Sequence, residues 1–119
     1  MSNQVSYSTE ITGPTLVVIF NESQLVFPDQ LRPVESQLAL GGSEADFQSA
    51  VFDFSGVTYI SSSIWGELIR LNKLLQDGGC ACRLCNLTAP LQEALEVMKL
   101  EELLPVSPTR QDALAEFAS

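Results

Sequence analysis

The chain has 119 residues, 45 % of them hydrophobic and 18 % charged, a balance that indicates one globular domain over residues 1–119. Fifteen acidic against six basic side chains give a net charge of −9, which repels phosphate backbones and anionic lipid surfaces. No apolar run approaches the length of about 18 residues that crosses a bilayer, and the first twenty residues lack a basic stretch followed by an apolar one. We therefore expect neither nucleic-acid binding nor direct membrane insertion, and a cytoplasmic location.

Two strands are expected at the start of the chain. Residues 5–11 alternate moderately between apolar and polar side chains, and residues 15–20 form a continuous apolar run rich in β-branched residues. Gly13-Pro14 between them is a turn signal, so the two strands should form a hairpin.

A first helix is predicted from Leu31, Val34 and Leu38, whose spacing puts them on one helical stripe, and Gly41-Gly42 should close it. Pro33 leaves two alternatives for this helix. Either the helix starts near Arg32 with the proline at its first position, or it is kinked at the proline.

The middle of the chain predicts an acidic loop over residues 41–48, then a strand over residues 50–54 that is apolar on both faces and therefore central. A long helix should follow and end at Gly78-Gly79. Its inner stripe is made by apolar side chains at helical spacing, namely Ile64, Leu68, Leu71 and Leu75, widened by Trp65 and Ile69.

The last third predicts a strand over residues 80–87 and a helix capped by Thr88 with Pro90 near its first position. Leu91, Leu95 and Met98 should face the core from this helix.

A short edge strand is expected over residues 103–106, where Pro105 costs least, followed by a helix capped by Thr109 that carries Ala113, Leu114 and Phe117. The element order predicts a single α/β domain with a mixed, mostly parallel sheet of four or five strands and about four helices.

The residue inventory excludes most catalytic constellations. The chain has no histidine, so Ser-His-Asp and Cys-His sites cannot form, and the glycine-rich signatures that cradle nucleotide phosphates are missing. Cys80, Cys82 and Cys85 are too few for a structural zinc site, and in a strand Cys85 would point away from the other two. We expect buried free thiols, no metal, no cofactor, no catalytic residue and no enzymatic activity.

Three consecutive serines, Ser61, Ser62 and Ser63, stand where the loop after residues 50–54 should meet the long helix. We call these three residues the serine run. A hydroxyl at a helix N-terminus can cap the helix, and a phosphate added there would meet free backbone N–H groups. From the residues alone, the serine run is either an ordinary cap or a chemical switch.

The stretch V-F-D-F-S-G-V-T-Y-I-S-S-S-I-W-G, together with the element order over nearly the whole chain, resembles the STAS domain. In particular it resembles the stand-alone bacterial anti-sigma factor antagonists, in which the loop before the second helix usually reads Asp-Ser-Ser-Gly and its first serine is phosphorylated. The resemblance puts Ser61 at the aspartate, Ser62 at the phosphorylated serine, Ser63 at the second serine and Ile64 at the glycine.

The resemblance implies a non-enzymatic regulator that binds an anti-sigma factor with serine kinase activity and that a phosphatase resets. Ser62 is the expected phosphorylation site, ahead of Ser63 and Ser61. The partner surface would contain Ile64, Trp65 and the serine run, together with Gln24, which stands where the family has an aspartate after the second strand; Trp65 would enlarge either the buried face or the partner surface.

An alternative stays open, in which the chain is a constitutive STAS scaffold or subunit without phosphorylation. It would then belong to a stressosome-like assembly or to a lipid-transport ATPase complex.

Overall fold

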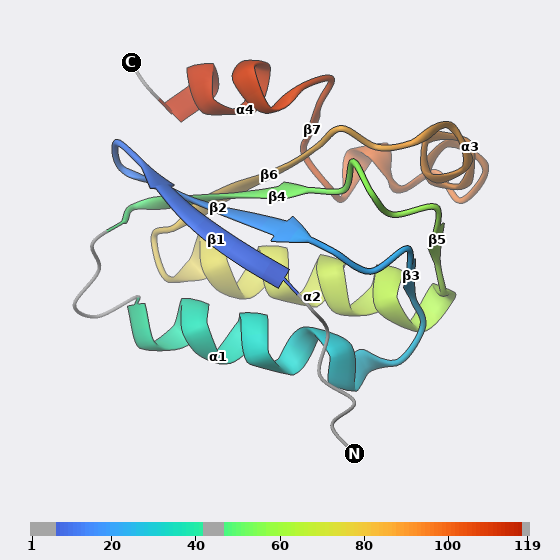
Figure 1. The fold of residues 1–119 in the computed structure, drawn as a ribbon, viewed down its shortest axis with the longest axis horizontal. Helices are drawn as coiled ribbons and strands as arrows, with labels where there is room; N and C mark the ends of the chain where they lie inside the picture. Colours follow the sequence, from blue (N-terminus) through green and yellow to red (C-terminus); the bar gives the residue numbers. More distant parts are fainter. Residues whose placement is uncertain (1–6, 42–46, 118–119) are drawn as a thin grey trace.

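The structure, a computed structural model that describes residues 7–41 and 47–117, is built around a five-stranded sheet (Figure 1). The strand order is β1-β2-β4-β6-β7; β1 runs antiparallel to β2, and every other neighbouring pair is parallel. The strands are β1 (Tyr7–Thr12), β2 (Thr15–Phe20), β4 (Ser49–Asp53), β6 (Ala81–Cys85) and β7 (Val106–Ser107). This is the mostly parallel α/β sheet that the element order predicts.

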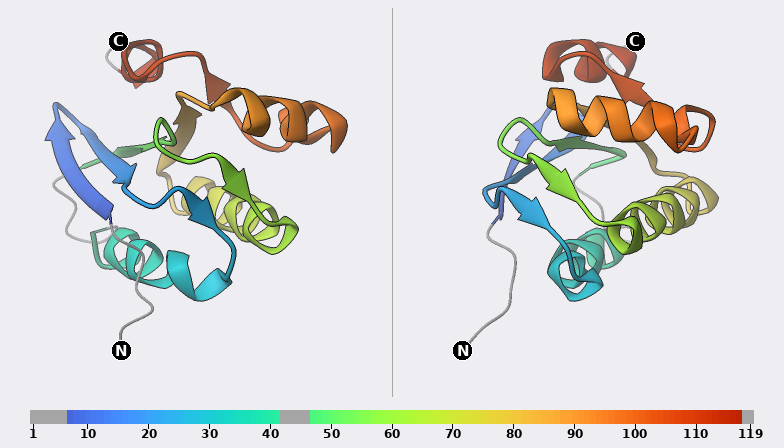
Figure 2. Two further views of the ribbon diagram at one scale, coloured as in Figure 1. Left: turned by 45° about the vertical axis from the view of Figure 1, so that its right-hand side comes forward. Right: turned by 90° about the vertical axis from the view of Figure 1, so that its right-hand side faces the viewer.

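Of the four α-helices in the described residues, α1 and α2 cover one face of the sheet and α4 the other, while α3 lies beyond its end (Figures 1 and 2). The helices are α1 (Arg32–Gly41), α2 (Ser62–Asp77), α3 (Ala89–Val97) and α4 (Arg110–Phe117). Two 3-10 turns, η1 (Pro28–Leu31) and η2 (Leu100–Glu102), precede α1 and follow α3. In the described ranges no helix is long and apolar enough to cross a membrane.

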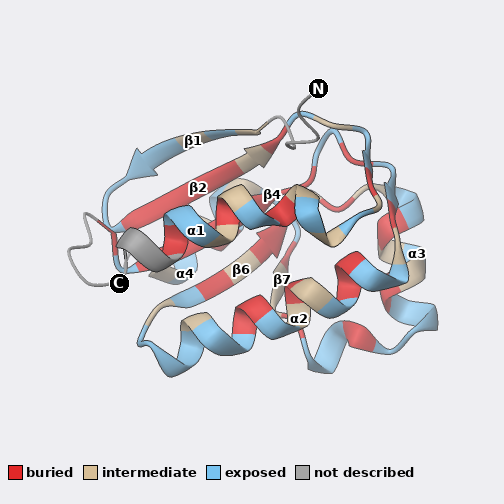
Figure 3. Ribbon diagram, turned by 90° about the horizontal axis from the view of Figure 1, so that it is seen from below, coloured by how far each residue is buried: buried red, intermediate tan, exposed pale blue. Residues whose placement is uncertain are grey.

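Two hydrophobic cores of unequal size lie on the two faces of the sheet. The larger core lies under α1 and α2, where Figure 3 shows the inner faces of the helices and the central strands as buried. Phe20 from β2 stacks there on Phe54, with ring centroids 5.1 Å apart. The smaller core lies under α4 and centres on Val17, Val51, Cys85 and Ala113.

The predictions for the first half of the chain are largely confirmed. The hairpin turns at Gly13, whose φ of +59° favours glycine, and β2 has the predicted bounds. The helix starts at Arg32 with Pro33 in its first turn, so the first of the two alternatives holds, and Leu31, Val34 and Leu38 are all buried. Residues 5–6 of the first predicted strand and 42–46 of the acidic loop lie outside the described residues.

Two predictions for the second half are wrong. Met98 was expected to face the core but is 43 % exposed, because α3 ends at Val97 and Met98 lies beyond its last turn. The edge strand over residues 103–106 is instead the two-residue β7, Val106–Ser107, and Leu103 is exposed. Leu91, Leu95 and Ala113 are buried as predicted, and Thr109 caps α4 by accepting a hydrogen bond from the backbone N–H of Asp112 at 3.1 Å.

A second, two-stranded sheet has no counterpart among the predicted elements. Its strands, β3 (Gln24–Leu25) and β5 (Tyr59–Ile60), pair in parallel, with Gln24 opposite Tyr59 and Leu25 opposite Ile60. This small sheet closes the end of the molecule between η1 and α3, directly before α2 begins (Figure 2, right). The small sheet therefore positions the serine run at the start of α2.

Candidate functional site at the N-terminus of helix α2

Ser61 is the N-cap residue of α2. Its backbone is extended, with φ −71° and ψ 162°, and its Oγ accepts a hydrogen bond from the backbone N–H of Ile64 at 3.2 Å. The same hydroxyl donates to the backbone carbonyl of Val26 at 2.6 Å. Because Ser61 satisfies one free amide of the helix and one carbonyl of the neighbouring segment, its hydroxyl has a structural role.

Ser62 and Ser63 are the first two residues of α2, and both side chains are exposed. The first turn of the helix carries no acidic side chain. The backbone amides and the helix dipole make this end of a 16-residue helix favourable for negative charge. The serine run is thus divided between one hydroxyl used as a cap and two that face solvent.

The small β3–β5 sheet brings Gln24 next to the serine run. Gln24 pairs with Tyr59, and the backbone N–H of Ser61 donates to the Leu25 carbonyl at 2.9 Å. The Gln24 side chain is exposed, while its backbone carbonyl accepts a hydrogen bond from the side chain of Gln30 at 3.3 Å. Gln24 and the serine run, which are more than 35 positions apart in the sequence, thereby lie on one surface.

Ile64 and Trp65 do not lie on that surface. Their side chains are 0 % and 1 % exposed and belong to the larger core. Of the two places proposed for Trp65, the structure shows the buried face. The helical spacing that put Ile64 and Trp65 on the inner stripe of α2 indicated their core positions, whereas the family resemblance that put them at the partner surface did not.

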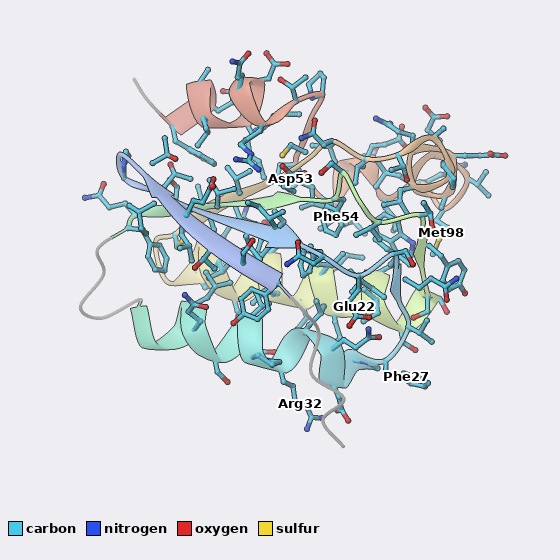
Figure 4. All side chains as sticks on the ribbon, in the orientation of Figure 1. Glu22, Phe27, Arg32, Asp53, Phe54 and Met98 are labelled. Atoms are coloured by element: carbon cyan, nitrogen blue, oxygen red, sulfur yellow. The ribbon has the colours of Figure 1, made fainter. Side chains whose placement is uncertain are left out.

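Two exposed aromatic side chains flank the start of α2 and were not singled out in the sequence. Phe27 is 67 % exposed directly before η1, and Tyr59 is 51 % exposed in β5. Phe27 projects outward at this end of the molecule, where Met98 also lies (Figure 4). Large exposed apolar groups that cluster near polar residues are typical of protein contact sites. Phe27 precedes Pro28-Asp29, a turn signal that could have indicated its exposure.

Asp53 anchors the loop that leads from β4 to the serine run. It is 2 % exposed and accepts hydrogen bonds from the backbone N–H of Ser55 at 2.9 Å and from the Asn86 side chain at 3.2 Å. Arg110, the first residue of α4, donates to Asp53 at 2.9 Å and forms an ion pair with Glu10 on β1 at 2.9 Å. Figure 4 shows Asp53 at the end of β4 that faces α4.

Burial would by itself raise the pKa of Asp53, because it removes the carboxylate from water. The hydrogen bonds from Ser55, Arg110 and Asn86 outweigh this effect, and the pKa of Asp53 lies below its ordinary value. The carboxylate is therefore charged at neutral pH, and it ties β4, β6, α4 and the loop together.

Cys82 and Cys85 lie on opposite faces of β6 and are buried, as the strand geometry predicts, whereas Cys80, expected in the same strand, precedes β6. Cys82 belongs to the larger core and Cys85 to the smaller one, while Cys80 is half-buried, and all three are free thiols. Burial raises the pKa of both Cys82 and Cys85 to about 12. Within residues 7–41 and 47–117, no group of three or more potential ligands could hold a metal ion.

Fold and site together define a mixed-sheet α/β domain whose longest helix begins with exposed hydroxyls beside two exposed aromatic rings. Comparison with known proteins shows the family: the model of the STAS domain matches residues 10–113, so the chain belongs to the STAS domain family. No curated protein sequence matches the chain.

Several solved structures share the fold at low sequence identity. An anti-sigma-factor antagonist (STAS) domain protein from Planctomyces limnophilus is 21 % identical, with a TM-score of 0.74 over 99 % of this chain and 100 % of that one. An anti-sigma factor antagonist from Mycobacterium paratuberculosis is 16 % identical, with a TM-score of 0.75 over 97 % and 95 %. The Bacillus cell fate determinant SpoIIAA in its phosphorylated form is 14 % identical, with a TM-score of 0.66 over 94 % and 99 %.

Proposed function

We propose that this protein is a non-catalytic anti-sigma factor antagonist whose binding surface surrounds the N-terminus of α2 and is switched by phosphorylation of Ser62. The observation that carries the proposal is the exposed Ser62 hydroxyl at the first position of α2, in a STAS domain whose structural neighbours include three anti-sigma factor antagonists. The partner is an anti-sigma factor with serine kinase activity, and a phosphatase resets the switch.

Within the serine run, Ser61 serves as the helix cap and Ser62 serves as the phosphorylation site. Phosphorylation of Ser61 would break its hydrogen bonds to Val26 and Ile64, so it opposes folding of the helix start. Ser62 loses no such contact, and transfer of the γ-phosphoryl group of ATP to its Oγ places the phosphate near the free amides of α2. The resemblance to the family register favours Ser62 over Ser63.

The unmodified surface suits a protein partner. Phe27 and Tyr59 offer apolar area, and Gln24 and Ser63 offer exposed polar groups beside it. A phosphoserine carries about −1.5 to −2 charges at pH 7 and binds water strongly. Burying the doubly charged phosphate in this interface would cost desolvation energy, so phosphorylation releases the partner.

The test combines phosphate mapping with binding. The protein is incubated with ATP and an anti-sigma factor kinase from the same organism, and the modified residue is located by mass spectrometry. We expect one phosphate, on Ser62, that is lost in Ser62→Ala and kept in the matched variant Ser63→Ala. Ser62→Asp should weaken partner binding, measured by titration calorimetry, by about tenfold or more, which corresponds to about 1.4 kcal/mol.

Absence of phosphate from the whole serine run, together with undiminished binding by Ser62→Asp, would overturn the proposal. The same pair of results would support the constitutive alternative, in which the surface around α2 is a permanent interface of a larger assembly.

A further inference from the structure

A groove of about 540 Å³ lies on the far half of α2, away from the serine run. One wall is α2 and the other is the segment that follows α3. The lining residues on α2 are Ile69, Asn72, Lys73, Gln76 and Asp77, and those on the other wall are Glu101, Glu102, Leu103 and Pro105. Lys73 lies eleven residues after Ser62, about 16 Å along the helix axis at 1.5 Å per residue.

Three apolar side chains line the groove. Leu103 is 52 % exposed, and Ile69 and Pro105 are half-buried. An exposed leucine beside two partly covered apolar side chains gives a partner apolar surface to bury.

The two walls are joined by a buried residue. Asn72, 6 % exposed, donates from Nδ2 to the Leu103 carbonyl at 3.3 Å and accepts at Oδ1 from the Cys82 thiol at 2.7 Å. These bonds connect α2 to β6 and to the segment after α3, so the groove is present before any partner arrives. Preorganisation of this kind lowers the entropic cost of binding.

The rim of the groove is acidic. Among the residues that line the groove, Asp77, Glu101 and Glu102 are acidic and exposed, and Lys73 is the single cation. Arg70, the nearest other basic residue on α2, does not line the groove and is held by Glu35 and Glu67, each at 2.8 Å. The rim therefore keeps an excess of negative charge, and the net charge of −9 adds long-range attraction for cationic partners.

We propose that this groove docks a basic, amphipathic segment of a partner protein. An aliphatic side chain of that segment packs on Leu103 and Ile69, and lysine or arginine side chains pair with Asp77, Glu101 and Glu102. The apolar side chains in the lining favour a protein segment over a small cation, which gains nothing from contact with Leu103. The site does not include the serine run, so it gives the protein a second contact surface that is independent of Ser62.

The test uses the full chain and a fluorescein-labelled peptide of about 14 residues, with leucines at helical i, i+3, i+4 and i+7 spacing and lysines elsewhere. Affinity is measured by fluorescence anisotropy at low ionic strength. We expect Glu101→Lys/Glu102→Lys to weaken binding by about tenfold, and Lys73→Glu to strengthen it about threefold, because both change the charge at the rim. The matched control, Glu93→Lys/Glu96→Lys on exposed positions of α3, makes the same change in net charge outside the groove and should lower the affinity by about twofold or less.

Three outcomes would overturn the proposal: no binding of the peptide, equal loss in the groove and control variants, or equal binding of a peptide whose leucines are replaced by serine. Leu103→Ser, at an exposed position, checks the apolar contact and should weaken binding without loss of fold as followed by circular dichroism. Phosphorylation of Ser62 should proceed equally in all these variants, so failure here is distinguishable from failure of the proposed switch.

Discussion

At the scale of single residues, the start of α2 depends on the Ser61 hydroxyl. It caps the Ile64 amide and donates to the Val26 carbonyl, so it joins the helix to the segment after β3. Its two neighbours have the same chemistry but face solvent. A run of three identical residues therefore contains one structural position and two that are free for function.

Ser61→Ala should lower the free energy of unfolding by about 1–2 kcal/mol, because it removes a helix cap and leaves the Val26 carbonyl without this donor. Ser62→Ala, the matched control, should change it by less than about 0.5 kcal/mol, as for an exposed surface position. Urea denaturation followed by circular dichroism measures both. Equal stability of the two variants would contradict the cap assignment.

At the scale of secondary-structure elements, α4 combines a small apolar contact with a polar anchor. It has eight residues, and only Ala113 is fully buried among them. Its anchor is polar: Arg110 bridges the buried Asp53 of β4 and Glu10 of β1. Since Asp53 also holds the backbone of Ser55, this one carboxylate fixes both α4 and the loop toward the serine run.

Asp53→Asn should destabilise the protein at pH 7 by about 2 kcal/mol, because charge-assisted hydrogen bonds become neutral ones. The pKa of Asp53 is lower in the folded than in the unfolded chain, so its contribution is complete above about pH 4 and is lost as the pH falls through the folded pKa. The stability difference between wild type and variant, from denaturation at a series of pH values, should therefore shrink below about pH 4. A difference that stays constant down to pH 2 would contradict this account.

At the scale of the whole molecule, the sheet separates two cores of unequal size. Cys82 lies in the larger core under α1 and α2, and Cys85 lies in the smaller core under α4. Both are 3 % exposed or less, and burial raises the pKa of each thiol to about 12. Thiolate, the reactive form, is therefore rare in both cores at neutral pH.

An aromatic disulfide reagent at pH 8 should leave Cys82 and Cys85 unmodified in the native protein and react slowly with the half-buried Cys80. In denaturant all three cysteines should react quickly, which absorbance of the released thiolate measures. Arg110→Gln should expose Cys85 before Cys82, because it frees α4 and leaves α1 and α2 in place. Equal labelling of the two in that variant would show that the faces open together.

The local pattern of apolar and polar residues was sufficient to predict most helices and strands. It also placed the serine run at the start of the long helix. The period of Ile64, Leu68 and Leu71 predicts α2, and the continuous apolar run in residues 50–54 predicts a central strand, because both signals come from the side of an element that the core covers. The family and its sheet were also within reach of the sequence, since element order limits how parallel strands connect.

Only the tertiary structure decided which residues the surface around the serine run contains. Gln24 and Phe27 reach it through the β3–β5 pairing, and each of those strands is two residues long, too short to leave a periodic signal. Pairing across 35 positions also gave Ser61 its acceptor in Val26 and left Ser62 exposed. Hydrogen bonds between segments that are distant in the sequence depend on how the chain packs. For this reason the sequence alone could not show that Ser61 caps the helix while Ser62 and Ser63 face solvent.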